Sequence, residues 1–281
     1  MKLGVHVSIS GSLDLSIDRA LELGCDTFQI FTRNPRQWAP RNLTHIEVEK
    51  FTSKLAQSEI APVVAHMPYL PNIASPRKDV YKKSVNVLKT EMQRCGVLNI
   101  PYLVTHLGSH LGSGRRNGCK RVIDACNHCL SKADNDVVLL LENSAGTRNS
   151  IGRTFEDIQL IIEGIKHKDR VGVCFDTCHA FAAGYELREK TMLKNTLKKI
   201  DDVIGLERVK IVHLNDSKGG LGSKIDRHEH IGLGFIGERG FQTILKNRAI
   251  TRLPLILETP IDARRDDYEN LAKVKELAKK S

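Results

Sequence analysis

Eight short apolar runs recur along the chain: LGVHVS (3–8), TFQIFT (27–32), PVVAHM (62–67), PYLVTHL (101–107), VVLLLEN (137–143), VGVCFDT (171–177), VKIVHLND (209–216) and LPLILETP (253–260). Most are rich in Val, Ile and Leu, as strands buried on both faces of a parallel sheet are. From the third run onward they return about every 36 residues, the length of one strand, one helix and two loops. The runs therefore predict repeated strand–helix units.

Amphipathic segments separate the runs, and their apolar residues return every three or four positions, which is the period of an α-helix. These segments are residues 13–24, 45–58, 77–96, 119–133, 155–167, 189–205 and 241–247. Eight strand–helix units predict a (β/α)8 TIM barrel with a parallel eight-stranded core. We expect residues 1–281 to form it as a single domain. A doubly wound open sheet is the alternative, but it would not gather all eight strand ends around one centre.

Seven runs carry a metal-binding side chain at or near their C-terminal end: His6, His66, His106, Glu142, Asp176, His213 and Glu258. The C-terminal ends of the strands of a parallel barrel converge on one rim, where ligands that lie far apart in sequence meet. Folding alone does not require an imidazole or a carboxylate there, because barrel strands favour Val, Ile and Leu. The recurrence therefore indicates a functional site.

The polar side chains expected at this rim form a set of metal ligands. His179 follows the sixth run, and the long segment after the seventh run adds Asp226 and His228. Imidazole and carboxylate donors without an essential thiolate suit zinc, manganese or iron. Buried acids that face one another would repel unless cations neutralised them. The nine candidates are enough for two or three ions with a bridging carboxylate: His66, His106, Glu142, Asp176, His179, His213, Asp226, His228 and Glu258.

Three details stay open at this point. His228 and His230 lie two residues apart on an extended segment, so both could face one way. His6 could orient a ligand or a substrate without binding metal itself. Cys126 and Cys129 resemble half a zinc site or a redox pair, but they lie in a helical pattern without a second half, which favours partly buried thiols.

The net charge of +10, from 43 basic and 33 acidic residues, suggests a polyanionic partner, nucleic acid first. Much of the excess lies on helices, where lysines usually form a solvated face. The seven cysteines have no disulfide-scaffold spacing, which suits a reducing compartment. Neither a signal-peptide pattern nor an apolar run long enough to span a bilayer occurs. We therefore expect an intracellular protein, cytoplasmic or nucleoid-associated, with no membrane partner.

Several closely spaced metal ions suit a displacement at phosphorus, because they stabilise the attacking and leaving oxygens and lower the pKa of water. Two other functions are possible on such a barrel. One is a metal-dependent sugar isomerase or epimerase. The other is a DNA-binding barrel that keeps zinc for structure only, with full coordination and no reactive water.

Nine motifs together resemble the endonuclease IV family of apurinic/apyrimidinic endonucleases: GVHVS (4–8), FTRNPRQW (31–38), HMPYL (66–70), HLGSHLG (106–112), LENSAG (141–146), VCFDTCHAFAAGY (173–185), HLNDSK (213–218), DRHEHIG (226–232) and LETP (257–260). The resemblance covers almost the whole chain. The Asp-Thr-Cys-His and Asp-Arg-His runs are its most specific parts. Met67-Pro68 departs from the short polar residues usual after the first histidine, which concerns loop rigidity and not metal binding.

The resemblance implies a TIM barrel with three zinc ions per chain, with manganese possible at some sites. The first ion would be held by His66, His106 and Glu142, and Glu142 would bridge to the second. Asp176, His213 and Glu258 would complete the second, and His179, Asp226 and His228 would bind the third. This pattern selects His228 over His230 and gives Glu142 a catalytic role.

The implied activity is DNA repair. The enzyme would hydrolyse the phosphodiester 5′ to an abasic site, leave a 3′-hydroxyl and a 5′-deoxyribose phosphate, and trim blocked 3′ ends. Its partner would be double-stranded DNA with abasic sites, bound by a monomer. Loop side chains would fill the gap left by the missing base and hold the duplex bent. The candidates for contact with DNA are Arg36, Gln37, Trp38, Tyr69, Leu70 and Ser109, although Trp38 could instead pack its own loop.

Overall fold

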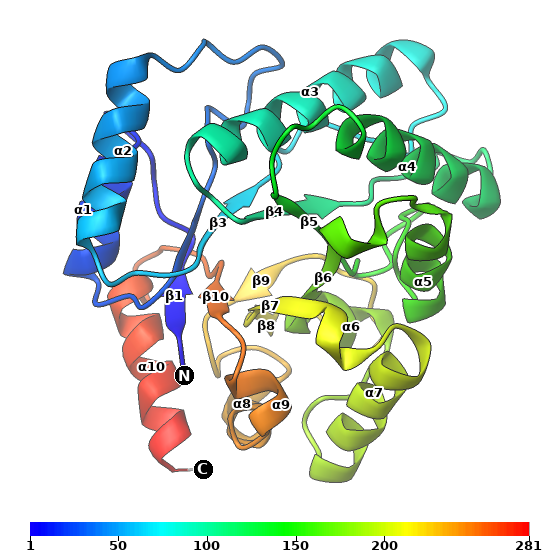
Figure 1. The fold of residues 1–281 in the computed structure, drawn as a ribbon. Helices are drawn as coiled ribbons and strands as arrows, with labels where there is room; N and C mark the ends of the chain where they lie inside the picture. Colours follow the sequence, from blue (N-terminus) through cyan, green and yellow to red (C-terminus); the bar gives the residue numbers. More distant parts are fainter. Residues whose placement is uncertain (281) are drawn as a thin grey trace.

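The computed structural model describes residues 1–280, so Ser281, the last residue of the predicted domain, lies outside the described residues. Eight parallel strands form one sheet in the order β1-β10-β7-β6-β5-β4-β3-β2 (Figure 1). They are β1 (Leu3–Val5), β2 (Phe28–Ile30), β3 (Val63–His66), β4 (Tyr102–His106), β5 (Val138–Glu142), β6 (Val171–Asp176), β7 (Val209–His213) and β10 (Leu255–Leu257). Each predicted run contains one of these strands.

The barrel closes between β1 and β2. His6 and Gln29 form a parallel bridge just beyond β1, and the Val7 amide donates a hydrogen bond to the Gln29 carbonyl at 2.7 Å. Gly4 makes this approach possible, since a Cβ at that position would lie 1.6 Å from the Thr27 carbonyl oxygen. The predicted (β/α)8 TIM barrel is therefore confirmed, and the open sheet is excluded.

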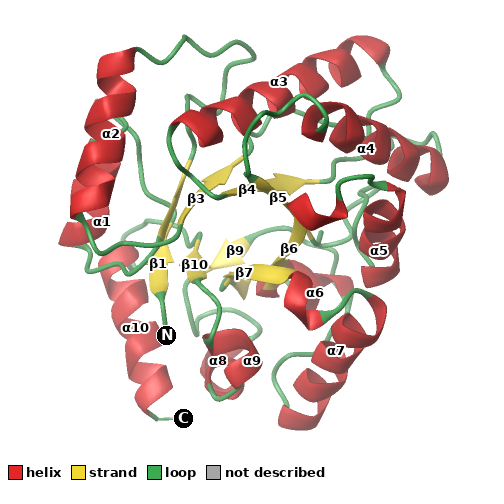
Figure 2. Cartoon of the chain, in the orientation of Figure 1, coloured by secondary structure: helices red, strands yellow, loops and turns green. Residues whose placement is uncertain are grey.

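Helices surround the strands (Figure 2). They are α1 (Leu15–Glu22), α2 (His45–Gln57), α3 (Lys78–Val97), α4 (Arg115–Leu130), α5 (Phe155–Gly164), α6 (Thr177–Ala183), α7 (Lys190–Val203), α8 (Gly237–Leu245), α9 (Arg248–Thr251) and α10 (Asp267–Lys279), with short 3₁₀ turns at Lys168–Arg170 and Leu206–Arg208. Within residues 1–280 no helix is both long and apolar enough to cross a membrane.

Besides α9 and α10, two features of the fold lie outside the predicted segments. The short helix α6 begins directly after β6, because the Asp176 carboxylate caps it by accepting a hydrogen bond from the His179 amide at 2.6 Å. The long segment after β7 contains a small antiparallel pair, β8 (Asp216–Ser217) and β9 (His228–Glu229). Both elements lie beside the C-terminal ends of the strands, where the predicted ligands are.

The strand alternation places the rim ligands inside the barrel. Six buried side chains form a separate cluster in the interior: Val64, Val104, Leu140, Cys174, Ile211 and Ile256. Residues two apart on a strand point to the same face. Each of the six is followed, two residues later, by one of the predicted rim ligands: His66, His106, Glu142, Asp176, His213 and Glu258. The candidate ligands therefore form a polar layer directly above the apolar interior of the barrel, on its C-terminal side.

Candidate metal centre

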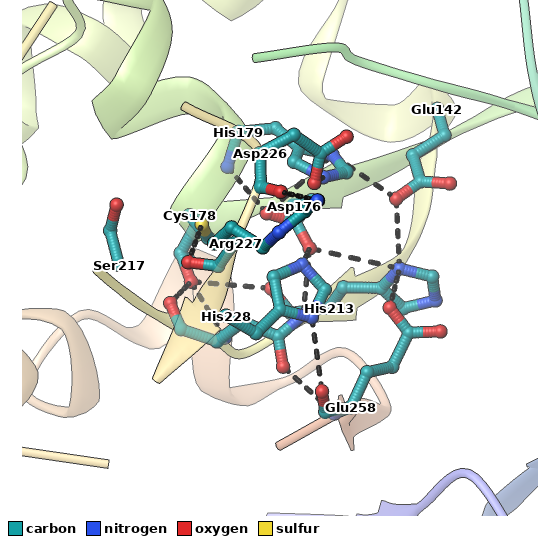
Figure 3. Close-up of polar contacts among 12 residues, drawn as sticks. Glu142, Asp176, Cys178, His179, His213, Ser217, Asp226, Arg227, His228 and Glu258 are labelled. Atoms are coloured by element: carbon teal, nitrogen blue, oxygen red, sulfur yellow. Dashed lines mark hydrogen bonds and ion pairs between the residues drawn. The ribbon is translucent and has the colours of Figure 1, made fainter. Parts of the chain in front are cut away.

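Side chains at the ends of six strands, on helix α6 and in the segment after β7 converge at the C-terminal mouth of the barrel. Figure 3 shows those of Glu142, Asp176, His179, His213, Asp226, His228 and Glu258. Their potential ligand atoms lie within 4.8 Å of one another in distinct groups. The first group is His66, His106 and Glu142; the second is Glu142, Asp176, His213 and Glu258; the third is His179, Asp226 and His228. The structure thus brings all nine candidate ligands together, in the sets that the family resemblance implies.

Glu142 lies at the centre of this arrangement, fully buried, with its two carboxylate oxygens turned to different histidines. Oε2 is 3.2 Å from Nε2 of His66 and 3.4 Å from Nε2 of His106. Oε1 is 3.1 Å from Nδ1 of His213 and 3.3 Å from Nδ1 of His179. One carboxylate therefore belongs to two groups of donors, which is the geometry of a bridging ligand.

In their neutral form, His66 and His213 direct an unprotonated nitrogen at the acids. His66 donates its Nδ1–H to the Met67 carbonyl at 2.7 Å, and His213 donates its Nε2–H to Oε1 of Gln29 at 2.9 Å. A carbonyl oxygen only accepts, so these nitrogens carry the protons of the neutral rings. The other ring nitrogen then presents a lone pair toward Glu142. Such a contact is repulsive without a cation and typical of a metal-bound histidine.

The third group shows the same pattern. His179 donates Nδ1–H to the Asn143 carbonyl at 2.9 Å and turns Nε2 to Oδ1 of Asp226 at 3.0 Å. His228 donates Nδ1–H to the Glu258 carbonyl at 3.0 Å. The Nε2 atom of His228 is buried without a hydrogen-bond partner and lies 3.6 Å from Oδ2 of Asp176. A buried nitrogen without a partner is costly, so it points to a missing ligand.

The spacing of the donors fits metal ions. Zinc binds nitrogen and oxygen at about 2.0 to 2.2 Å in a tetrahedron, which separates the donor atoms by about 3.3 Å. The contacts of Glu142 with His66, His106 and His213 span 3.1 to 3.4 Å. In addition, Nδ1 of His213 lies 3.2 Å from Oε2 of Glu258, so one nitrogen faces two carboxylates. A single proton cannot satisfy both acids, whereas a cation can.

Without metal ions the cluster would hold protons. Burial raises the pKa of Glu142, but His106, His213 and His179 outweigh burial and hold that pKa well below its ordinary value. Burial lowers the pKa of His179, but Asp176, Asp226 and Glu142 outweigh it, so the pKa of His179 lies well above its ordinary value. Metal ions and protons therefore compete for the same imidazoles.

Gln29 is a site residue that the sequence analysis missed. It is fully buried on β2 and donates its amide N–H to Oε1 of Glu258 at 2.6 Å and to Nδ1 of His6 at 2.9 Å. Its carbonyl oxygen accepts from His213. Gln29 thereby fixes the protonated nitrogen of His213 and the orientation of Glu258. The available signal in the sequence was a polar glutamine in the middle of an otherwise apolar strand.

Two asparagines also hold the acids in place. Asn215 donates its amide N–H to Oδ2 of Asp176 at 2.7 Å and accepts from the Glu258 amide at 2.8 Å. Asn143 donates to the Asp176 carbonyl and accepts from its amide. Both residues closely follow a strand that ends in a candidate ligand, β7 and β5. A sequence search for metal donors does not select them, because neutral amides are weak ligands for zinc.

His6 and His230 lie beside the ligands without joining any of the three groups. His6 contacts Gln29 and lies 3.8 Å from Oε1 of Glu258, in a position to orient its neighbours. His230 is fully buried and bonds to Oδ1 of Asp262 at 3.0 Å and to the amide of Asn270. His228 and His230 therefore do not face one way, although their spacing allowed it.

A cavity of about 470 Å³ opens above the ligands. Its lining includes His6, Phe31, Tyr69, Arg227 and Ile261, together with ligands of all three groups. A second cavity, of about 360 Å³, adjoins it on the side of the loops after β3, β4 and β5. The two cavities share Tyr69, His106 and Asp226, so the mouth of the barrel holds one divided cleft. His106, half exposed, lies at the division.

Three of the predicted DNA-contact residues line this cleft. Tyr69 is 69% exposed and packs the edge of its ring against Phe31 at 5.0 Å between centroids. Leu70 is exposed beside it and lines the second cavity. Ser109 also lines the second cavity, and its backbone is held by Asn72, whose amide bonds both the Ser109 N–H and its carbonyl. Tyr69 and Leu70 together leave apolar surface exposed at the edge of the cleft.

The other three lie on the segment between β2 and α2. Arg36 and Gln37 are exposed, whereas Trp38 is half buried and packs against the hydrophobic core. The ammonium of Lys83 lies 5.8 Å from the Trp38 ring centroid. This environment favours the packing role for Trp38, and it leaves Arg36 and Gln37 free to contact a ligand.

The cysteines act as packing residues. All seven are unpaired and buried, and burial raises the pKa of Cys129 and of Cys178 to about 12. Cys126 and Cys129 lie on α4, as the helical pattern predicted. Cys178 lies near Asp176 and His228, but its thiol donates to the Arg227 carbonyl at 3.6 Å. A protonated thiol is a poor metal ligand.

Comparison with known proteins places this centre in a family. A family model described as a xylose isomerase-like TIM barrel matches residues 17–279. The "Probable endonuclease 4" of Methanoculleus marisnigri is 56% identical over 277 residues, 98% of each chain. That of Nitrosopumilus maritimus is 50% identical over 280 residues, which is 99% of this chain and all of the relative.

A solved structure agrees along the whole chain. The crystal structure of endonuclease IV from Thermus thermophilus is 35% identical, covers 100% of both chains and superposes with a TM-score of 0.89. Identity of this extent, over nearly the full length of several relatives, is far beyond what a shared barrel alone produces. The chain therefore belongs to the endonuclease IV family.

Proposed function

We propose that this protein is a metal-dependent DNA repair endonuclease that hydrolyses the phosphodiester on the 5′ side of an abasic site. The observation that carries the proposal is the shared carboxylate of Glu142, which contributes an oxygen to each of two adjacent groups of buried imidazoles and acids. Closely spaced cation sites that share a ligand suit phosphoryl chemistry. The endonuclease relatives support the same reaction class.

Three zinc ions per chain are the proposed cofactors, with manganese as an alternative at some sites. His66, His106 and Glu142 would hold the first, and Glu142 would bridge to the second. The second would be completed by Asp176, His213 and Glu258, and the third would be held by His179, Asp226 and His228. All of these ligands come from one chain, which supports action as a monomer.

When bound, the metal ions would supply positive charge at the attacking and leaving oxygens of the phosphodiester and lower the pKa of water toward neutrality. Glu142 would hold the first two ions in one unit, since it is fully buried and each of its oxygens lies beside a histidine of a different group. Gln29 and Asn215 keep Glu258, His213 and Asp176 in fixed orientations. Fixed charges in a site that excludes water are worth more than the same charges in solution.

The proposed reaction balances as a hydrolysis. A water oxygen bonds to phosphorus, and the bond from phosphorus to the 3′ oxygen of the preceding nucleotide breaks. That oxygen takes a proton and leaves as the 3′-hydroxyl, so the phosphate stays on the 5′ carbon of the abasic deoxyribose. Removal of blocking groups from 3′ ends breaks the equivalent bond and belongs to the same proposal.

The cleft supports recognition of an abasic nucleotide. Without a base to unstack, such a nucleotide leaves the duplex at lower cost than a normal one. The cavity of about 470 Å³ leads from the surface to all three groups of ligands. Tyr69 and Leu70 stand exposed at its edge, where they would fill the space that the missing base leaves in the duplex.

The direct test is incision of a duplex with one synthetic abasic site by the purified protein. The assay is run before and after verified metal removal, and again after zinc is restored. We expect cutting on the 5′ side of the lesion, loss of cutting without metal and recovery with zinc. Cutting that persists in verified metal-free protein would refute the mechanism. Zinc without any cutting would favour a purely structural role, and turnover of a ketose instead of DNA would favour an epimerase.

A further inference from the structure

We infer that a buried charge network of Arg33, Glu91 and Arg94 fixes the shape of the loop between β2 and α2 (residues 31–44) and thereby sets how well the protein distinguishes abasic from intact DNA. The inference rests on the proposed function. It assigns positioning roles to three residues that contact neither the candidate metal ligands nor the cleft that lies above them.

The network is built from charges that are almost completely enclosed. The side chains of Arg33 and Glu91 are 4% and 0% exposed, and Nε of Arg33 lies 3.1 Å from Oε1 of Glu91. The hydroxyl of Thr32 links the third member, because it donates to Oε2 of Glu91 at 2.6 Å and accepts from Nε of Arg94 at 2.9 Å. Glu91 and Arg94 lie on α3, whereas Arg33 and Thr32 belong to the loop.

The two guanidinium groups hold the loop at both sides of its tip. Arg33 donates to the carbonyls of Gln37 at 3.0 Å and Trp38 at 3.2 Å. These bonds close the turn formed by residues 33–38. Arg94 donates to the Arg41 carbonyl at 3.1 Å and to the Thr32 carbonyl. A rigid guanidinium fork suits such paired acceptors, and a lysine cannot reproduce it.

The loop that is held in this way borders the cleft: Phe31, its first residue, lines the metal-lined cavity and packs against Tyr69 at 5.0 Å between centroids, and Pro35 lines an adjoining cavity. Inside the turn, the side chain of Asn34 accepts a hydrogen bond from the Arg36 amide at 3.0 Å, and the side chain of Arg36 is exposed. Arg36 is close enough to Tyr69 for its charge to oppose the rise that burial causes in the pKa of that phenol. Arg36 therefore lies near Tyr69, which lines the metal-lined cavity.

The composition of the network argues against a purely structural purpose. Two buried cations and one buried anion cost more desolvation energy than an apolar contact of the same volume, and replacing such triads by apolar residues often leaves a fold as stable or more so. What the network provides is one fixed loop shape. A loop that is already ordered loses less conformational entropy when it binds, so its contacts contribute more to affinity.

The test compares Arg33→Lys with Arg170→Lys. Arg33→Lys keeps the charge beside Glu91 and removes the fork on Gln37 and Trp38. Arg170 is the matched control. It lies just before β6, at the far end of the barrel, and donates to the carbonyls of Ala133 and Val137, which precede β5. For both variants one measures metal content, melting temperature, kcat, and the ratio of Kd for intact and abasic duplexes.

We expect Arg33→Lys to lower that ratio about tenfold, with kcat at saturating DNA and metal content close to the parent. Arg170→Lys should lower the melting temperature by a similar amount to Arg33→Lys but leave the ratio of Kd values unchanged. In an Arg36→Ala background, Arg33→Lys should have little further effect, because it acts through the tip. An unchanged ratio in Arg33→Lys, an equal fall in Arg170→Lys, or full additivity with Arg36→Ala would overturn the inference.

A second measurement separates this inference from the proposed function. Hydrogen exchange of the backbone amides of Asn34, Arg36, Gln37 and Trp38 should become faster in Arg33→Lys and stay unchanged in Arg170→Lys. Equal protection of these amides in parent and Arg33→Lys would contradict loop positioning whatever the enzyme does. A parent protein that fails to discriminate abasic from intact duplex would instead contradict the proposed function.

Discussion

Nε2 of His228 lies 3.6 Å from Oδ2 of Asp176, buried and without a hydrogen-bond partner. The other nitrogen of the ring is already committed to the Glu258 carbonyl. A neutral histidine in this position directs its lone pair at a carboxylate, an arrangement that needs a cation in between. The relationship also joins the second and third groups of ligands, so the whole centre is one connected unit.

Glu142→Gln should abolish incision while leaving the fold largely intact. The amide keeps the size of the carboxylate but removes the negative charge that two groups of imidazoles share. We expect turnover on an abasic duplex to fall about a hundredfold or more, with fewer metal ions per chain by mass spectrometry and an unchanged circular dichroism spectrum. Near-normal turnover would count against the bridging role.

Gln29→Leu should weaken the second metal site without removing a ligand. The change preserves approximate volume but leaves His213 free to protonate either nitrogen and releases Glu258. Loss of such a supporting contact typically costs about 10- to 100-fold in metal affinity or activity. Chelator competition measures the affinity, and Gln159→Leu on α5, where the side chain donates to Glu163 instead of a candidate ligand, is the control. If both variants bind metal like the parent, Gln29 has no orienting role.

Metal affinity should rise with pH through the neutral range. In the metal-free protein the pKa values of His179 and His213 lie well above the ordinary value, so both rings hold a second proton near neutrality. A metal ion must displace these protons, and each displaced proton changes the affinity about tenfold per pH unit below the raised pKa. Calorimetry in buffers of different ionisation enthalpy would detect the released protons. A pH-independent affinity between about pH 6 and 8 would contradict this competition.

Arg36→Ala and Tyr69→Ala should weaken the preference for abasic DNA more than they weaken DNA binding in general. Both side chains are exposed, Tyr69 in the lining of the cleft and Arg36 near Tyr69, where they could fill the space that a missing base leaves. Competition binding with abasic and intact duplexes gives the two affinities, and Arg208→Ala, before β7 at the far end of the barrel, is the control. Variants that discriminate as well as the parent would exclude insertion by these residues.

Arg227→Gln should reduce DNA affinity similarly for all sequences and lower its salt dependence. Arg227 is exposed at the cavity edge, where a phosphate contact would release a counterion. We expect the slope of log K against log salt to decrease in magnitude by about one. Lys198→Gln on the outer face of α7 is the matched control and should leave the slope unchanged. An equal slope for Arg227→Gln and the parent would mean that no phosphate lies there.

The strand pattern was sufficient to predict the barrel and to bring the candidate ligands to one rim. The prediction succeeds for a geometric reason, because side chains two residues apart on a strand point to the same face. His66 follows the interior residue Val64 by two positions, and Glu142 follows Leu140 in the same way. Sequence spacing also showed that Asp226 lies in a long segment on that face. The grouping of ligands came from the family resemblance; three of the four groups of possible donors in the structure have the same members, and the fourth is Asp176, Cys178 and His228.

Other features depend on contacts that spacing does not encode. His228 and His230 look equivalent along the chain, yet their partners are Asp176 and Asp262. Gln29 is an uncharged residue that is not a typical metal ligand. Its role follows only from its position between His213 and Glu258. Arg33 and Glu91 lie far apart in the sequence, so their pairing became visible only once α3 was placed beside the loop.

An anomalous-scattering map of crystals grown with zinc tests the central claim most directly. The account predicts three peaks in the mouth of the barrel, one within bonding distance of each group of ligands, with Glu142 shared by two of them. Peaks scattered over the surface, or a mouth without any peak at full zinc saturation, would contradict it.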